Sequence, residues 1–128
     1  MDEYLKPNAL FDKLLSKYRE HGGLVVACDF DHTLYSCDPD AYYGMARQLV
    51  RDLYAKNCYI IIWTGNKDTD FVKGFLAQVN VPFHSINTDA PFVPLDKIGR
   101  KIHANVFIDD RAGLKEVYSV LTDLLKVI

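Results

Sequence analysis

The chain has 128 residues, of which 49% are hydrophobic and 25% are charged, and its formal net charge is −2. This composition is typical of a globular protein, and we expect one domain over residues 1–128. No basic run indicates extended nucleic-acid binding, and no apolar run approaches the ~20 residues that a membrane helix needs. The lack of an apolar leader and the odd number of cysteines favour a cytoplasmic protein.

Helical and strand-like patterns alternate along the first half of the chain. Apolar residues at helical spacing over 10–18 predict a helix, and the apolar run 24–28 predicts a buried strand. Asp38 and Pro39 then predict the N-cap and first turn of a second helix. The apolar stripe of that helix runs over 42–53. The start of the chain therefore has a helix–strand–helix order.

The same alternation continues in the middle of the chain. The run 58–63 predicts a second buried strand, and Asn66 predicts the cap of a helix with apolar positions over 71–79. Residues 82–86 form a weaker strand pattern. Two prolines within 87–100 favour a loop with one helical turn there. This part of the chain repeats the order strand, helix, strand.

The last predicted elements are a strand at 104–108 and an amphipathic helix over 114–125. Alternating helices and buried strands predict an α/β fold, a Rossmann-like three-layer sandwich with a mainly parallel central sheet and helices on both faces. Ligands of such sheets bind at the carboxyl ends of the strands. The residues that follow each predicted strand are therefore the candidates for a functional site.

Acidic residues follow two of the predicted strands. Asp29 and Asp31 come at the end of the first strand, and Asp109 and Asp110 at the end of the last one. Four acids at one edge of a sheet would repel one another unless a cation neutralised them. Mg²⁺ takes oxygen ligands and commonly combines one or two carboxylates with substrate phosphate. The acids therefore predict a site for a hard divalent cation such as Mg²⁺.

Groups suited to a phosphate lie near the same edge. Thr64 supplies a hydroxyl, the turn at Gly65 and Asn66 supplies backbone N–H groups, and Lys101 supplies a positive charge. A carboxylate can attack phosphorus to form an aspartyl-phosphate, which splits one difficult step into two. A second acid two residues away can protonate the leaving oxygen and later deprotonate water. The pattern therefore indicates phosphoryl transfer.

Three motifs resemble those of the haloacid dehalogenase-like (HAD) superfamily, in that family's order. "DFDHTL" (29–34) resembles its first motif, DxDx(T/V)(L/V), and "IIIWTGN" (60–66) its second, a Ser or Thr that closes a hydrophobic strand. "VFIDD" (106–110) resembles the fourth motif, an acidic pair after a strand. The spacing in "KIHANVFIDD" (101–110) resembles that from the third-motif lysine to the acidic pair. The resemblance covers residues 24–113.

The resemblance implies a role for each acid. Asp29 would be the nucleophile and a metal ligand, and Asp31 the general acid and base, with its backbone carbonyl as a further metal ligand. Asp109 would hold Mg²⁺. Asp110 would be either a further ligand of the ion or a residue that hydrogen-bonds or contacts its ligands. The implied cofactor is therefore Mg²⁺, and the implied activity is that of a phosphatase.

The resemblance also implies phosphate-binding residues. Thr64 would hydrogen-bond the phosphoryl group, and Lys101 would neutralise the nucleophile and the phosphate. Lys97 is the alternative to Lys101, because two further basic residues lie near that position. An additional phosphate contact from Asn66, beside the N–H groups at Gly65, is our own interpretation.

The spacing of the motifs predicts a member without a cap domain. Thr64 follows Asp29 by 35 positions and precedes Lys101 by 37, and the predicted elements fill both intervals. In the superfamily an open site often accompanies a macromolecular substrate or a lid from a second subunit, although several capless members act on small metabolites. The expected partner is thus a phosphorylated metabolite, nucleotide or macromolecular end, with a homo-oligomer as an option.

Two other functions are compatible with an α/β fold. A catalytically idle HAD-like binding domain would need no acid at Asp31, whereas this chain retains one. A phospho-receiver module is similar in its clustered Asp, Thr and Lys, but its acidic pair follows the first strand. Here the acidic pair comes last, after the DxDxT motif. The receiver is therefore the weaker alternative.

Several residues near the motifs have less specific patterns. His32 lies inside the first motif, where a histidine more often forms local hydrogen bonds than it contacts substrate. Tyr42 and Trp63 are expected in the core, because each continues an apolar pattern. Tyr35 and Tyr43 are the candidates for an aromatic flap over the site.

Overall fold

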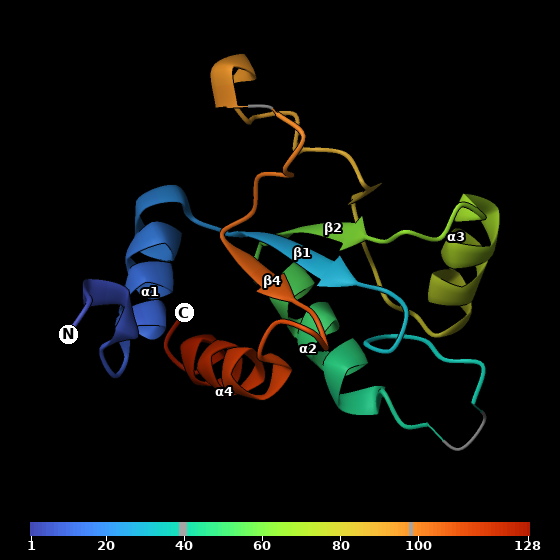
Figure 1. The fold of residues 1–128 in the computed structure, drawn as a ribbon, viewed down its shortest axis with the longest axis horizontal. Coiled ribbons are helices and arrows are strands. Elements are labelled where there is room, and N and C mark those ends of the chain that lie inside the picture. Colours follow the sequence, from blue (N-terminus) through green and yellow to red (C-terminus); the bar gives the residue numbers. More distant parts are fainter. Residues whose placement is uncertain (39–40, 98) are drawn as a thin grey trace.

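A computed structural model describes residues 1–38, 41–97 and 99–128 (Figure 1). Four strands form one sheet in the order β3-β2-β1-β4, and every neighbouring pair is parallel. The strands are β1 (Val25–Asp29), β2 (Tyr59–Trp63), β3 (Ser85–Ile86) and β4 (Val106–Ile108). The predicted α/β fold with a parallel central sheet is confirmed.

Helices separate the strands in the predicted order. The α-helices are α1 (Ala9–His21), α2 (Gly44–Ala55), α3 (Thr69–Gln78) and α4 (Leu114–Leu125), and the 3₁₀ helices are η1 (Glu3–Leu5) and η2 (Leu95–Lys97). Among the described residues, only α2 lies between β1 and β2, and only α3, β3 and η2 lie between β2 and β4. The described residues of these two intervals form no further domain. No helix in the described ranges has both the length and the apolar character to cross a membrane.

One face of the sheet is covered by the four α-helices. Alternate strand residues such as Val26 and Ile62 point to this face, because successive side chains of a strand alternate. They pack with the buried residues of all four helices, among them Leu14 of α1, Leu49 of α2 and Leu121 of α4. Figure 1 shows α2 and α4 side by side against this face. This larger cluster is the main core of the protein.

The other face of the sheet is covered by a segment without an α-helix. Val25 and Ile61 point to this face and pack with Val93 and Ile102 of the segment 88–104. Figure 1 shows the segment on the side of the sheet away from α2 and α4. In the described part of that segment, the expected helical layer is reduced to the 3₁₀ helix η2, because prolines interrupt the stretch before it.

Helix α2 begins later than the sequence predicts. It starts at Gly44 with Tyr43 at its N-cap, and the predicted first helical residue, Pro39, lies outside the described residues. Tyr42 is 80% exposed, so its expected place in the core is wrong. Met45 is exposed as well. The apolar stripe begins only within the helix, where side chains face the sheet.

Helix α3 is capped two residues after the predicted position. The side chain of Asp68 accepts a hydrogen bond from the N–H of Phe71 at 3.0 Å, which is the usual N-cap contact. The Asn66 side chain instead accepts from the N–H of Asp68 at 2.9 Å and forms a turn before the helix. Both residues are suitable caps, and Asp68, which directly precedes the first helical residue, is the one that caps the helix.

Candidate active site

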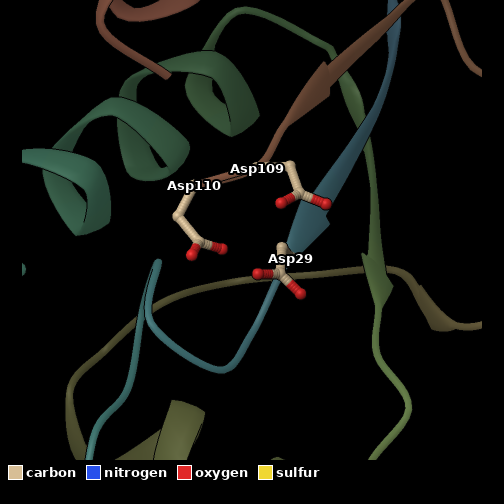
Figure 2. Close-up of side chains that lie close together, drawn as sticks. All are labelled: Asp29, Asp109 and Asp110. Carbon is tan, nitrogen blue, oxygen red and sulfur yellow. The ribbon is translucent and has the colours of Figure 1, made fainter. Parts of the chain in front are cut away.

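Three carboxylates meet at the carboxyl ends of β1 and β4. Asp29 is the last residue of β1, and Asp109 and Asp110 follow β4 directly. One carboxylate oxygen of each residue lies within 4.8 Å of those of the other two (Figure 2). The register of β1 and β4, which pairs Cys28 with Ile108, places the two strand ends side by side. Three of the four acids that the sequence places at this edge thus come together.

A buried hydroxyl connects two members of this acidic cluster. Thr33 is fully buried, and its Oγ1 accepts a hydrogen bond from the N–H of Asp110 at 3.1 Å. The same oxygen lies 3.2 Å from Asp29 Oδ2 and 3.4 Å from Asp110 Oδ1, so its single proton can be donated to either carboxylate. Thr33 therefore holds the loop after β4 against the loop after β1.

The loop after β1 is a tight turn around one carbonyl group. The carbonyl oxygen of Phe30 accepts from the N–H groups of Thr33, Leu34 and Tyr35 at 3.3, 2.9 and 3.0 Å. His32 has a φ of 64°, an unusual conformation for a residue other than glycine, and its side chain is exposed. This turn brings Thr33 back toward Asp29.

An aromatic cluster beneath the turn keeps it in place. The ring of Tyr35 stacks on the buried ring of Phe30, with centroids 5.2 Å apart, and its edge meets Phe71 and Phe75 of α3. Tyr35 is therefore packed against the protein, and the aromatic flap stays a prediction for Tyr43.

Burial and neighbouring charge disfavour ionisation of Asp29. Burial, a hydrogen bond with the Asp110 carboxyl and the charge of Asp109 together raise the pKa of Asp29 to about 7, against the opposing hydrogen bond from Thr33. No salt bridge between described residues reaches Asp29, Asp109 or Asp110. The negative charge of the cluster therefore lacks a protein counterion there.

The cluster fits the requirements of a hard divalent cation. Asp29, Asp109 and Asp110 offer only oxygen atoms, and these lie close enough to share one ion. A cation would also offset the repulsion that raises the pKa of Asp29. The donor set is therefore suited to Mg²⁺, the ion that the resemblance implies.

Asp31 lies next to the cluster without joining it. Its backbone forms an isolated parallel bridge with Tyr35, and its half-buried carboxylate is not one of the three clustered groups. No hydrogen bond or ion pair with another described residue occupies that carboxylate. It is thus available for proton transfer, which is the role the sequence predicts.

The predicted phosphate-binding turn follows β2 at the same edge of the sheet. Thr64 is buried, and its Oγ1 accepts from the N–H of Asn66 at 3.0 Å across the exposed Gly65. The side chain of Asn87 accepts from the Thr64 N–H at 2.8 Å and donates to the Thr64 carbonyl at 2.7 Å. No hydrogen bond between described residues joins Thr64 to the acidic cluster.

The predicted lysines are not brought to the acids. Lys97 and Lys101 are exposed and line a hollow of about 410 Å³ together with Arg100 and Phe107. In Figure 1, η2 lies apart from the sheet, and the described residues after it return to the sheet and enter β4 at its amino end. The phosphate lysine therefore stays a prediction, with Lys101 and Lys97 at similar positions.

A larger hollow of about 930 Å³ lies at the opposite edge of the sheet. Val25 and Tyr59, the first residues of β1 and β2, line it together with His84. None of its lining residues is acidic, and it is separated from the carboxyl ends by the length of the strands. The acidic edge is therefore the candidate site for chemistry in this structure.

Three residues at the site had no assigned role in the sequence analysis. Thr33 stands in the first motif, where a polar residue between apolar neighbours could have indicated a buried contact. Asn87 gives no signal, because its role depends on where β3 ends. Trp63, expected in the core, is 36% exposed at the end of β2.

Comparison with known proteins supports the fold alone. No protein-family model and no curated protein sequence matches the chain. A solved structure, that of a conserved protein coded by a locus from Bacteroides thetaiotaomicron, is similar with a TM-score of 0.63 at 21% identity. The similarity covers 79% of this chain and 91% of that chain.

Proposed function

We propose that the protein is a Mg²⁺-dependent phosphomonoesterase of the HAD type that works through an aspartyl-phosphate on Asp29. The observation that carries this proposal is the acidic cluster at the carboxyl edge of a parallel sheet. One of its members, Asp29, begins the DxDxT motif, and no hydrogen bond or ion pair with another described residue occupies the carboxylate of Asp31 two residues later. This pair supplies the nucleophile and the proton carrier that the reaction needs.

The first step is attack on phosphorus. An oxygen of the Asp29 carboxylate forms a bond to phosphorus while the bond from phosphorus to the ester oxygen breaks. The leaving oxygen takes the electron pair of that bond and receives a proton from the Asp31 carboxyl group. The products are the free alcohol and an aspartyl-phosphate.

The second step restores the enzyme. The ionised Asp31 takes a proton from water, and the water oxygen attacks the phosphorus of the aspartyl-phosphate. The bond from phosphorus to Asp29 then breaks, which releases inorganic phosphate and the Asp29 carboxylate. The same acid thus gives a proton in one step and recovers one in the other.

Asp29, Asp109 and Asp110 would hold the magnesium ion, with the backbone carbonyl of Asp31 as a further ligand. When bound, the ion would neutralise phosphoryl oxygens that carry negative charge beside these carboxylates. Thr33 would keep Asp29 and Asp110 in place through its hydroxyl group. The chain itself thereby orients the nucleophile.

An idle phosphate-binding domain is the second candidate. The exposed positions of Lys97 and Lys101 favour it, because a HAD enzyme would bring a lysine to the phosphate. The carboxylate of Asp31, which no other described residue binds, favours the enzyme, since binding alone needs no proton carrier. These two observations point to different experiments on the same protein.

Hydrolysis of p-nitrophenyl phosphate with and without Mg²⁺ tests the proposal. We expect metal-dependent turnover by the wild type, no turnover by Asp29→Asn, and a loss of about 10²-fold or more in Asp31→Asn. Asp12→Asn is the matched control, because Asp12 is an exposed residue of α1 outside the cluster. It should retain full activity.

Calorimetric titration with Mg²⁺ separates the two candidates further. A protein that binds Mg²⁺ and phosphate but turns over neither p-nitrophenyl phosphate nor a panel of phosphorylated metabolites would be the idle domain. A protein that binds no Mg²⁺ at pH 8 would contradict both candidates.

A further inference from the structure

Trp63 is an exposed aromatic residue at the end of a central strand. It is the last residue of β2, and 36% of its surface is exposed although both neighbours, Ile62 and Thr64, are buried. Single exposed apolar residues are common on protein surfaces, so exposure alone indicates nothing. The position of this one relative to the acidic cluster is what carries the inference.

Trp63 lies beside the proposed nucleophile on the same face of the sheet. The parallel register of β1 and β2 pairs Trp63 with Asp29, and neighbouring strands lie about 4.8 Å apart. Alternation places Trp63 on the face of Ile61, and Asp29 on that of Ala27, and both of these residues belong to the cluster beneath the segment 88–104. The indole and the Asp29 carboxylate therefore rise from paired positions on one face of the sheet.

The backbone that carries the indole is fixed on both sides. The β1 ladder pairs it with Asp29 on one side, and on the other Asn87 binds both the N–H and the carbonyl of Thr64, the next residue. The ring itself has no partner of this kind. None of the aromatic contacts between described residues includes Trp63.

We propose that Trp63 binds a planar ring on the leaving group of the substrate, so that the site prefers phosphomonoesters of nucleosides to those of aliphatic alcohols. This inference rests on the proposed function. Asp29 is short and Trp63 is long, and both rise from adjacent positions of one face, so the indole reaches past a phosphoryl group held at Asp29. A base attached to that phosphoryl group can stack on the indole, and stacking of this kind is worth about tenfold or more in affinity.

Two substrate sources share this chemistry. A free nucleoside monophosphate and the phosphorylated end of a nucleic acid both present a base close to a phosphomonoester. The described residues between the strands form no cap domain that would exclude the end of a nucleic acid. Adenosine monophosphate and a short 5′-phosphorylated oligonucleotide therefore serve as the two probes, and glycerol 3-phosphate as the probe without a ring.

Tryptophan fluorescence measures the contact without any turnover. Trp63 is the single tryptophan of the chain, so a change in emission reports on this position alone. In the Asp29→Asn variant with Mg²⁺, adenosine monophosphate should quench the emission and saturate. Glycerol 3-phosphate and inorganic phosphate should change it little. Equal responses to all three would overturn the proposal, because they would show an effect of phosphate and not of the ring.

Kinetics of Trp63→Leu and Trp63→Phe test specificity. We expect Trp63→Leu to lower kcat/KM for adenosine monophosphate about tenfold, mainly through KM, and to leave glycerol 3-phosphate within about twofold. Trp63→Phe should fall between the wild type and Trp63→Leu. Tyr4→Leu is the control for loss of an exposed aromatic residue, because Tyr4 lies in η1, away from the strand ends. A loss of equal size on both esters would assign Trp63 a merely structural role and overturn the proposal.

Failure of the proposed function would look different from failure of this inference. If the wild type hydrolysed no ester, the phosphatase would be lost, whereas selective quenching by adenosine monophosphate would still support the ring contact. If hydrolysis occurred without any preference for nucleosides, the phosphatase would stand and the inference would fall. Tighter quenching by the oligonucleotide than by adenosine monophosphate would support the contact and identify a nucleic-acid end as the source.

Discussion

The two faces of the sheet differ in what covers them and in the size of their apolar clusters. The face covered by the four α-helices carries the larger apolar cluster, which includes every buried helical residue from Leu14 to Leu124. The other face has a small cluster beneath the segment 88–104, and the acidic edge and Trp63 lie on its side of the strands. The helical face therefore supplies stability, and the loop-covered face presents the site.

This division follows from what each face can tolerate. A charged carboxylate beneath a packed helix would be costly, because burial removes it from water and from any cation. A loop layer leaves the strand ends accessible, so Asp29 remains only half buried, and no other described residue binds the carboxylate of Asp31. The comparison yields predictions about stability as well as about chemistry.

The largest expected effect comes from a matched pair of core substitutions. Ile61 and Ile62 are adjacent in β2 and both fully buried, but they point to opposite faces. We expect Ile62→Ala to lower the free energy of unfolding by about 4 kcal/mol and Ile61→Ala by about 2–3 kcal/mol, because a loop can relax into the space more readily than packed helices can. Urea unfolding followed by circular dichroism measures both.

Equal losses of unfolding free energy in the two alanine variants would contradict this difference between the faces, since the loop layer would then pack as firmly as the helices. Ile61→Val and Ile62→Val provide the control, because each removes a single methylene and leaves the β-branched shape in place. Their costs should be smaller, about 1 kcal/mol, and should rank in the same order.

A smaller effect is expected from the polar contact that joins the two loops of the site. Thr33→Val removes the hydroxyl that accepts from the Asp110 N–H and donates to the carboxylates of Asp29 or Asp110. Because this leaves a backbone donor without its partner, we expect a loss of about 1–3 kcal/mol in urea unfolding at pH 8. Thr33→Ser keeps the hydroxyl and should lose about 1 kcal/mol through its missing methyl group.

If the hydroxyl group of Thr33 holds the two loops together, the serine variant should retain activity and the valine variant should lose it. A serine variant that is as unstable and inactive as the valine variant would show that Thr33 acts through apolar packing. The site side of the sheet would then be held in the same way as the helical face.

Much of the fold could be predicted because each strand is a compact apolar run with a helix pattern on either side. Two strand-end acids, Asp29 and Asp109, could be placed together for the same reason, since parallel strands end at one edge. The starts of α2 and α3 could not be predicted in this way. Suitable caps such as Asn66 and Asp68 lie close together, and only packing selects one of them. Periodicity locates an element more reliably than its ends.

What the sequence did not determine at the site depends on irregular segments and on where short strands end. The position of Trp63 next to an apolar strand predicted burial, yet its exposure depends on what covers that face, which no local pattern encodes. The contact of Asn87 with Thr64 likewise depends on where the short strand β3 stops. Lys101 was placed from motif spacing, and spacing does not determine the path of an irregular segment. Tertiary structure decides all three.

The smallest expected effect tests the charge of the acidic cluster in the absence of metal. The pKa of Asp29 is raised from 3.8 to about 7, so the folded protein holds a proton there that the unfolded chain has lost. The stability of the metal-free protein should therefore fall as the pH rises from about 4 to about 7, and the full loss should remain at pH 8. Mg²⁺ replaces the proton, so it should raise Tm more at pH 8 than at pH 5.5.

The size of this shift follows from mass action. A metal present at ten times its Kd adds about 1.4 kcal/mol, which corresponds to a few degrees in Tm for a chain of this length. Asp29→Asn removes one charge from the cluster, so its metal-free form should melt above the wild type at pH 8 and gain less from Mg²⁺. Asp12→Asn should behave as the wild type does, because its carboxylate lies outside the cluster. If Mg²⁺ raised Tm equally at both pH values, or if Asp29→Asn melted below the metal-free wild type, the carboxylates would be compensated within the protein. The loop-covered face would then have no need of a cation.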